Sequence, residues 1–124
     1  MEPWVVADDI IRADVIRWTE GVFSRRGRSK KSLRVGERQV VAEVLNRTDD
    51  GWLMLLIRRC TITRDEFAGG SVPALKLESE VRRSIKTVLR GKPERLIWSD
   101  ESAREAIIRQ SLPVSRFFPP DVPD

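Results

Sequence analysis

A short turn between two apolar runs is the feature that most constrains how this chain can fold. Asp50 and Gly51 lie between the apolar-rich residues 40–45 and the apolar run 52–57. An Asp-Gly pair is typical of tight β-hairpin turns, because glycine adopts positive φ without steric cost. The sequence therefore predicts a hairpin of two strands, residues 38–47 and 52–62.

A further strand is predicted before this hairpin. Apolar residues alternate in residues 14–23, so that Ile16, Trp18 and Val22 share one face. This segment and residues 38–47 each follow a small residue and an acid, which favour the tight turns of small β-barrels. Residues 52–57 are apolar on both faces, which is typical of a central strand covered on both sides.

The second half of the chain has a helical pattern. After a loop with Gly69-Gly70 and Pro73, five apolar residues recur at helical spacing: Leu77, Val81, Ile85, Val88 and Leu89. We expect this helix to begin between Pro73 and Leu77 and to end at Gly91.

Residues 95–98 form a candidate short strand. Ser99 or Asp100 can cap a final helix that reaches about Ser111. The approximate inward stripe of this helix comprises Ala103, Ala106, Ile107 and Gln110.

These elements predict an α+β fold. We expect a small antiparallel, SH3-like or OB-like partial β-barrel followed by two C-terminal helices. A chain of 124 residues is one domain by length. Within it, residues 1–63 are β-rich, residues 73–111 are helical apart from the strand at 95–98, and residues 112–124 form a proline-rich tail.

The composition excludes several kinds of catalytic site. The chain has no histidine and one cysteine, Cys60, which excludes the usual zinc sites and Ser-His or Cys-His nucleophile pairs. A carboxylate site for magnesium is the remaining enzymatic alternative, and its candidate ligands are Asp8, Asp9, Asp14, Glu37 and Glu43. The strand that a nuclease would use for an acid-x-Lys pair, residues 52–60, has neither residue type. We therefore expect a protein that is not an enzyme, with no catalytic residue, metal or cofactor.

Cysteine usage and hydropathy bear on the location of the protein. A lone cysteine forms no intrachain disulfide and fits a reducing compartment. The first residues, MEPWVVADDIIR, make a poor signal peptide because they lack a basic n-region. The longest uninterrupted apolar run, residues 52–57, is far shorter than a bilayer span. We expect a cytoplasmic protein that does not enter a membrane.

A basic stretch between two predicted strands is the strongest candidate for a binding site. Six of the ten residues 25–34 are basic and none is acidic: Arg25, Arg26, Arg28, Lys30, Lys31 and Arg34. Such flexible basic loops commonly contact nucleic-acid phosphates, where charge supplies affinity without sequence choice. Arg58 and Arg59 could extend this patch, and Trp18, Phe23 and Trp52 could stack on bases.

A second set of basic residues, Arg82, Lys86 and Arg90, lies on one face of the predicted helix. The simpler interpretation is that this face is exposed to solvent.

From the basic stretch at residues 25–34, the sequence predicts a non-enzymatic nucleic-acid-binding accessory protein, for DNA or RNA. The alternative is a protein-interaction or assembly subunit, such as a homo-oligomer, that docks through Phe117 and Phe118 of the proline-rich tail.

Overall fold

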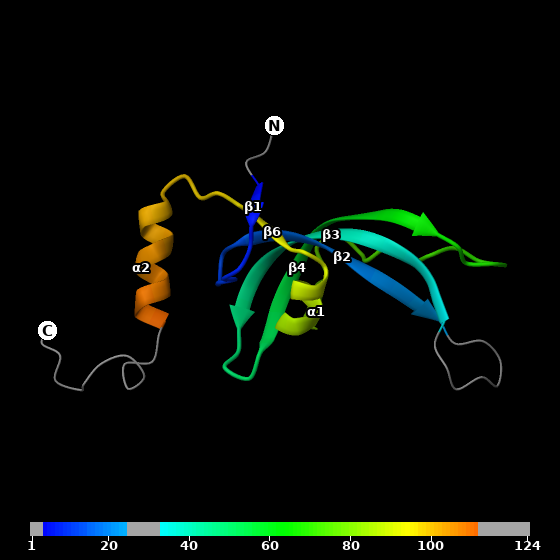
Figure 1. The fold of residues 1–124 in the computed structure, drawn as a ribbon, viewed down its shortest axis with the longest axis horizontal. Helices are drawn as coiled ribbons and strands as arrows, with labels where there is room; N and C mark the ends of the chain where they lie inside the picture. The colour runs from blue at the N-terminus through cyan, green and yellow to red at the C-terminus, as the bar shows by residue number, and fades with distance from the viewer. Residues whose placement is uncertain (1–3, 25–32, 112–124) are drawn as a thin grey trace, which may run out of the picture.

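The computed structural model describes residues 4–24 and 33–111, which form one antiparallel sheet and two short helices. The strands lie in the spatial order β1-β6-β2-β3-β4-β5 (Figure 1). Their bounds are β1 (Trp4–Val6), β2 (Val15–Ser24), β3 (Leu33–Arg47), β4 (Trp52–Asp65), β5 (Glu80–Ser84) and β6 (Glu94–Leu96). The helices are α1 (Ile85–Arg90) and α2 (Glu101–Ser111).

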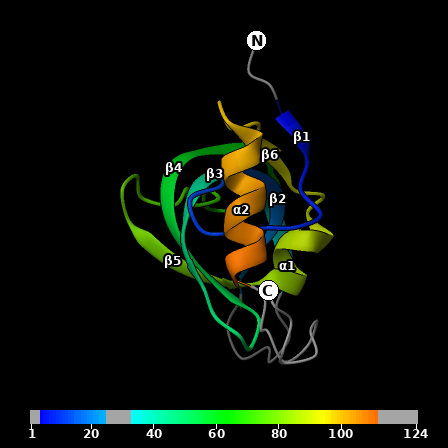
Figure 2. The same ribbon diagram turned by 90° about the vertical axis from the view of Figure 1, so that its left-hand side faces the viewer.

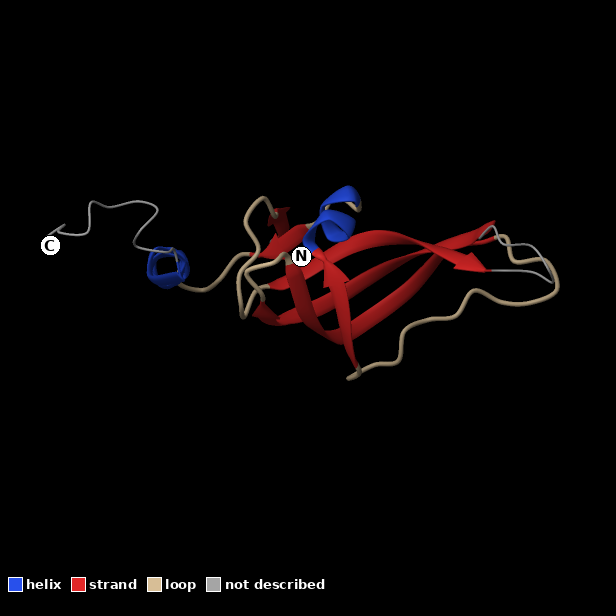
Figure 3. Ribbon diagram, turned by 90° about the horizontal axis from the view of Figure 1, so that it is seen from below, coloured by secondary structure: helices blue, strands red, loops and turns tan. Residues whose placement is uncertain are grey.

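The predicted hairpin around Asp50-Gly51 is confirmed. Gly51 has a φ of 93°, and the Thr48 amide donates to the Trp52 carbonyl at 2.9 Å to close the turn. The two strands are longer than predicted, because β3 and β4 continue together to the pair Gly36 and Asp65. With β2 they form a long twisted arm that extends past α1 (Figures 1 and 3).

The α+β class and the antiparallel sheet are confirmed, but the barrel is not. β1 and β5 end the sheet, and these two strands do not pair with each other. Figure 2 shows the sheet curving from β1 to β5, with α1 lying between its two ends. A six-residue helix therefore covers the core at the place where, in a closed barrel, β1 and β5 would pair with each other.

The core forms where the inward faces of the central strands meet α1. The alternation predicted for β2 is correct, since Ile16, Trp18 and Val22 are all buried. The main cluster of buried apolar side chains is Ala7, Ile10, Ile16, Trp18, Val40, Ala42, Val44, Leu53, Leu55, Ile57 and Val88. Val88 is the buried residue of α1, so this helix is held by apolar burial.

The prediction of one helix from about residue 77 to residue 90 was wrong. Residues 80–84 instead form β5, which pairs with residues 52–56 of β4, and only residues 85–90 are helical. The backbone groups on that edge of β4 need hydrogen-bond partners, and β5 supplies them. Ser84 then begins the helix by accepting a hydrogen bond from the Thr87 amide.

The predicted strand at residues 95–98 is β6, and it lies between β1 and β2. β1 was not predicted, because three residues are too few to show a period. Within the described part of the chain, neither helix has the length and apolar character that crossing a bilayer would require.

A buried ion pair attaches α2, and the predicted inward stripe was wrong at two of its four positions. Ala103 and Ala106 are exposed and Ile107 is half-buried, whereas Arg104 is only 4% exposed. The side chain of Gln110 lies outside the described part of the structure. Arg104 donates from Nε and Nη2 to the two carboxylate oxygens of Asp14, at 2.9 and 2.8 Å. The helix stands at the end of the sheet near the start of β2 (Figures 1 and 3), and the bonds between Arg104 and Asp14 attach it there.

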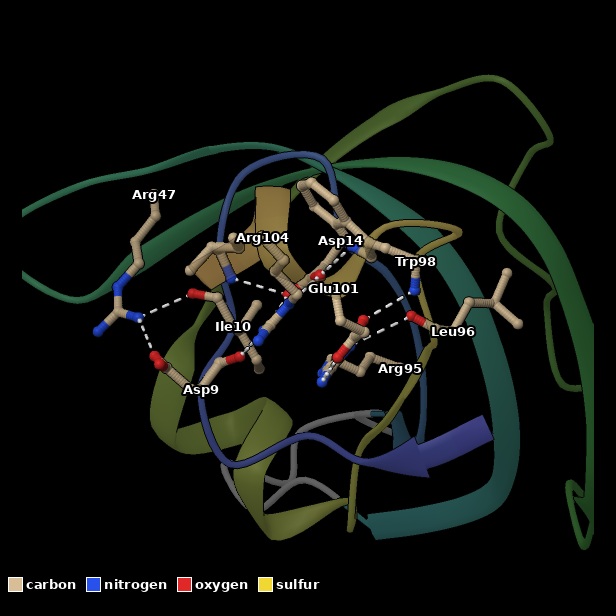
Figure 4. Close-up of polar contacts among 10 residues, drawn as sticks. Asp9, Ile10, Asp14, Arg47, Arg95, Leu96, Trp98, Glu101 and Arg104 are labelled. Carbon is tan, nitrogen blue, oxygen red and sulfur yellow. Dashed lines mark hydrogen bonds and ion pairs between the residues drawn. The ribbon is translucent and has the colours of Figure 1, made fainter. Parts of the chain in front are cut away.

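Other groups complete the surroundings of Asp14. Figure 4 shows Trp98 beside Arg104, both pointing toward this carboxylate. Trp98 Nε1 donates at 2.8 Å and the Ile11 amide at 3.0 Å, and Arg104 also donates to the Asp9 carbonyl. Every lone pair of a buried carboxylate needs such a partner, and here they come from three separate segments.

Glu101 makes a second polar clamp at the start of α2. Arg95 donates to both of its carboxylate oxygens, at 2.9 and 3.0 Å, and the Trp98 amide donates at 2.9 Å. The hydrogen bond from Arg95, followed by that from Trp98, lowers the pKa of Glu101 to about 2. These hydrogen bonds connect Glu101, in the first turn of α2, to Arg95 of β6, and they are exposed to solvent.

Replacing Arg104 should destabilise the fold more than replacing another arginine of the same helix. We expect Arg104→Met to lower the free energy of unfolding by about 3 kcal/mol, because it leaves Asp14 buried and unpaired. Arg109→Met is the matched control, since Arg109 is exposed. Urea denaturation measures both variants, and equal small losses would contradict the structural role of the pair.

Candidate nucleic-acid interface

One side of β2 is only partly covered by its neighbour. β6 pairs with β2 at Ile16 and Arg17, and the Thr19 amide then donates to the Gly91 carbonyl at 3.1 Å. Past Thr19, no strand of the described residues lies on this side. Because alternate residues of a strand direct their N–H and C=O groups to the same side, the backbone groups of Gly21 and Phe23 face this opening. They form an open edge of the sheet.

This open edge lines a groove that extends from α1 and the segment after it to the beginning of β3. The basic residues of its wall are Arg34, Arg38, Arg83, Arg90 and Lys92. The acidic residues are Asp8, Glu20, Glu37 and Glu94. The groove is therefore strongly polar, and its net charge depends on which of these groups neutralise one another.

Glu20 is the buried acid of the groove. Arg38 Nη2 lies 2.8 Å from one of its carboxylate oxygens, and Arg83 Nε lies 3.0 Å from the other. Trp18 Nε1 donates to Glu20 at 3.1 Å. Burial opposes ionisation, but the hydrogen bonds and charge of Arg83, and then of Arg38, outweigh it and lower the pKa of Glu20. The cluster keeps one net positive charge and holds the groove floor in place.

The other cations of the groove are more accessible. Arg34 forms a 2.7 Å ion pair with Glu37, but half of its side chain is exposed. Arg90 and Lys92 are exposed, and neither has a carboxylate partner among residues 4–24 and 33–111. The end of the groove at α1 therefore offers two unpaired positive charges.

Most of the predicted binding loop lies outside the described residues, including Arg25, Arg26, Arg28, Lys30 and Lys31. The two ends of this loop are described, since Ser24 and Leu33 are partners at the end of the β2–β3 pair. The loop therefore begins next to Phe23, where the open edge of β2 ends.

The structure places Arg58 and Arg59 away from the described ends of the loop, Ser24 and Leu33. Arg59 pairs across the sheet with Val41, eight residues along β3 from Leu33, a separation of roughly 26 Å. Arg58 is held at 2.5 Å by Glu43 and at 3.4 Å by Glu78. These two arginines lie on the middle of the sheet and form a surface apart from the groove.

The predicted stripe of Arg82, Lys86 and Arg90 does not exist as one helix face. Arg82 belongs to β5, where its guanidinium lies 4.1 Å from the centre of the Trp52 ring. Lys86 and Arg90 are on α1, so a strand and a helix share the three residues. The stripe was predicted because residues 77–90 were expected to form one helix, whereas Arg82 lies in a strand.

Of the three aromatic residues considered for base stacking, one is available. Trp18 is 1% exposed in the core, and Trp52 is occupied by Arg82. Phe23 is 59% exposed and lines the groove. Phe117 and Phe118, the predicted protein-docking residues, lie outside the described residues.

The candidate magnesium ligands are dispersed. Asp14 is bound by Arg104, Glu37 by Arg34, and Glu43 by Arg58. No group of three or more Asp, Glu, Cys or His side chains suited to a metal ion occurs in the described ranges.

The sequence analysis did not predict the buried cluster around Glu20. The sequence pattern that could have indicated it is an acidic residue on the same strand face as the apolar residues Ile16, Trp18 and Val22.

In comparisons with known proteins, no family model, curated protein or solved structure matches this chain. What the groove binds must therefore be inferred from its own groups. It combines exposed cations, backbone donors and acceptors that have no strand partner among residues 4–24 and 33–111, and one exposed aromatic ring. These are groups that bind phosphates and bases.

The buried carboxylate of the groove predicts a pH-dependent contribution to stability. We expect Glu20→Gln to lower the free energy of unfolding at pH 7 by about 2 kcal/mol, because two arginines lose their charged acceptor. Since folding lowers the pKa of Glu20 from 4.5, this stabilisation is complete above that value and is lost as the pH falls through the folded-state pKa.

Urea denaturation at several pH values measures the effect. The difference between the wild type and Glu20→Gln should shrink below pH 4.5. Glu66→Gln, an exposed substitution of the same kind, is the control and should have little effect throughout. A constant difference between wild type and Glu20→Gln at every pH would contradict an ionised Glu20.

Proposed function

We propose that this protein is a non-enzymatic nucleic-acid-binding accessory protein, in which the basic loop and the adjoining groove bind phosphates. One observation supports this more than any other. Arg90 and Lys92, which have no carboxylate partner in the described part of the chain, lie at one end of the open edge of β2, and the chain continues into a loop with five basic residues at the other. Basic residues thus occur in the sequence at both ends of the open edge.

The charge of the loop suits a polyanion better than a single acidic side chain. The eight residues 25–32 contain five basic residues and no acid. A nucleic acid that these residues neutralise releases condensed counterions, which gives affinity that falls steeply with salt. Phosphate contacts of this kind fix position without reading sequence, so binding should tolerate many sequences.

Three of the four acids of the groove are neutralised within the protein. Glu20 is shared by two arginines, Glu37 is paired with Arg34, and Glu94 is paired with Arg17 at 2.7 Å, which leaves Asp8 as the acid without an ion pair among the described residues. The Glu20 cluster also keeps its two guanidinium groups from moving toward a ligand. Binding should therefore depend mainly on the loop, on Arg90 and on Lys92.

A titration across salt concentrations tests the loop. We expect the quadruple substitution of Arg25, Arg26, Lys30 and Lys31 by serine to weaken binding of an oligonucleotide at low salt. The slope of log K against log salt should become shallower by about three, since each phosphate contact to a single strand contributes about 0.7. The matched control replaces Arg12, Lys76, Lys86 and Arg109, which do not line the groove, by serine.

The two quadruple variants lose the same charge, so they separate a local site from general attraction. A larger loss in the loop variant supports the proposal. Equal losses, or wild-type binding that does not change with salt, would overturn it.

A further inference from the structure

We infer that the groove along β2 accepts a single strand of nucleic acid, with a base stacked on Phe23. This inference rests on the proposed function and specifies the form of its ligand. Phosphate binding by the loop alone would suit a duplex and a single strand equally. The surroundings of Phe23 favour the single strand.

Phe23 is an exposed aromatic residue of β2, and the neighbouring residue on the same face of the strand, Gly21, has no side chain. It is 59% exposed, and its strand neighbour is Arg34. A Cβ atom placed on Gly21 would lie 3.2 Å from the Phe23 ring and 3.3 Å from Arg34 Nε. The ring and the guanidinium therefore lie next to the glycine, where a side chain would otherwise stand. Together the three residues form a low platform at the open edge.

This platform offers what an unstacked base needs. Aromatic rings and guanidinium planes stack on every base, because each base has a π-face. The N–H and C=O groups of Gly21 face the same opening and can bond to a base edge or a phosphate. Among the described residues, Phe23 is the one aromatic side chain that is exposed, whereas Trp18 is buried and the others are half-buried.

The cations on either side suit the backbone of the same strand. Thr19, beside Gly91, and Ser24, where the loop begins, are five residues apart in β2, a distance of roughly 17 Å. A few nucleotides of an extended strand cover this distance, with phosphates toward Lys92 at one end and toward the half-exposed Arg34 near the other. The stacked base would lie between them on Phe23.

The interior of a duplex cannot use the platform. Its bases are stacked on one another on both sides, so none away from the two ends presents a face to Phe23 without being unpaired and extruded. A duplex would bind through phosphate contacts alone. We therefore expect the protein to prefer a single strand, and we expect Phe23 to account for much of that preference.

Fluorescence anisotropy of the full chain with labelled oligothymidylate and with a duplex, each about 12 nucleotides long, tests the inference. We expect the single strand to bind at least tenfold more tightly, as one or more stacked bases would give. Phe23→Ala should weaken single-strand binding about tenfold and leave duplex binding unchanged. Leu77→Ala is the matched control, because Leu77 is similarly exposed, at 57%, and does not line the groove.

Two further variants keep the test decisive. Gly21→Val should also weaken single-strand binding, because it fills the space beside Phe23 without removing charge. Phe23→Trp should retain tight binding, because it preserves the stacking surface. A Phe23→Ala variant that fails to fold would therefore leave these two variants to decide.

The outcomes separate the two proposals. Equal binding of both ligands, unaffected by Phe23→Ala and Gly21→Val, would overturn the single-strand inference and leave phosphate binding by the loop intact. Binding of neither ligand at low salt would overturn the proposed function as well. Binding of an acidic peptide in place of either oligonucleotide would mean that the open edge pairs with a protein strand, and it would also overturn the inference.

Discussion

The buried pair of Asp14 and Arg104 holds the polar end of the molecule together. Its two residues are 90 positions apart in the sequence, and Trp98 and the Ile11 amide bond to the same carboxylate. Such a pair stabilises a fold when every lone pair is satisfied, and losing one partner leaves a buried charge. By anchoring the segment after β6, the pair helps to fix β6 against the first residues of β2.

That placement of β6 defines the groove. β6 is short, and the chain before it approaches β2 so closely at Gly91 that a Cβ there would lie 2.1 Å from the Thr19 carbonyl oxygen. The cover of β2 therefore ends at Thr19, although β2 continues for five more residues. The cluster of Arg38, Glu20 and Arg83 then forms a charged floor that apolar side chains do not fill. As a result, the part of β2 beyond Thr19 has an open edge, and the chain continues from it into the basic loop.

Patterns confined to a few residues were predicted correctly. The Asp50-Gly51 turn and the alternation of Ile16, Trp18 and Val22 depend on neighbours that are close in sequence. The errors occurred where a distant partner outweighed the local pattern. Residues 80–84 have helical spacing but pair with the edge of β4, and Arg104 replaces Ala103 and Ala106 on the inward side of α2 because Asp14 offers it a buried acceptor.

The sequence by itself determined the hairpin, the faces of β2 and the position of a basic loop between two strands, because turn chemistry and strand period are local properties. Its composition, with no histidine and one cysteine, also argued against sites that need histidine and against the usual zinc sites built from cysteine and histidine. Only the tertiary structure decided which charges are free. Glu20 meets Arg83 from 63 positions away, whereas Arg90 and Lys92 meet no described carboxylate. Ion pairing depends on distances in space, which no spacing in the sequence records.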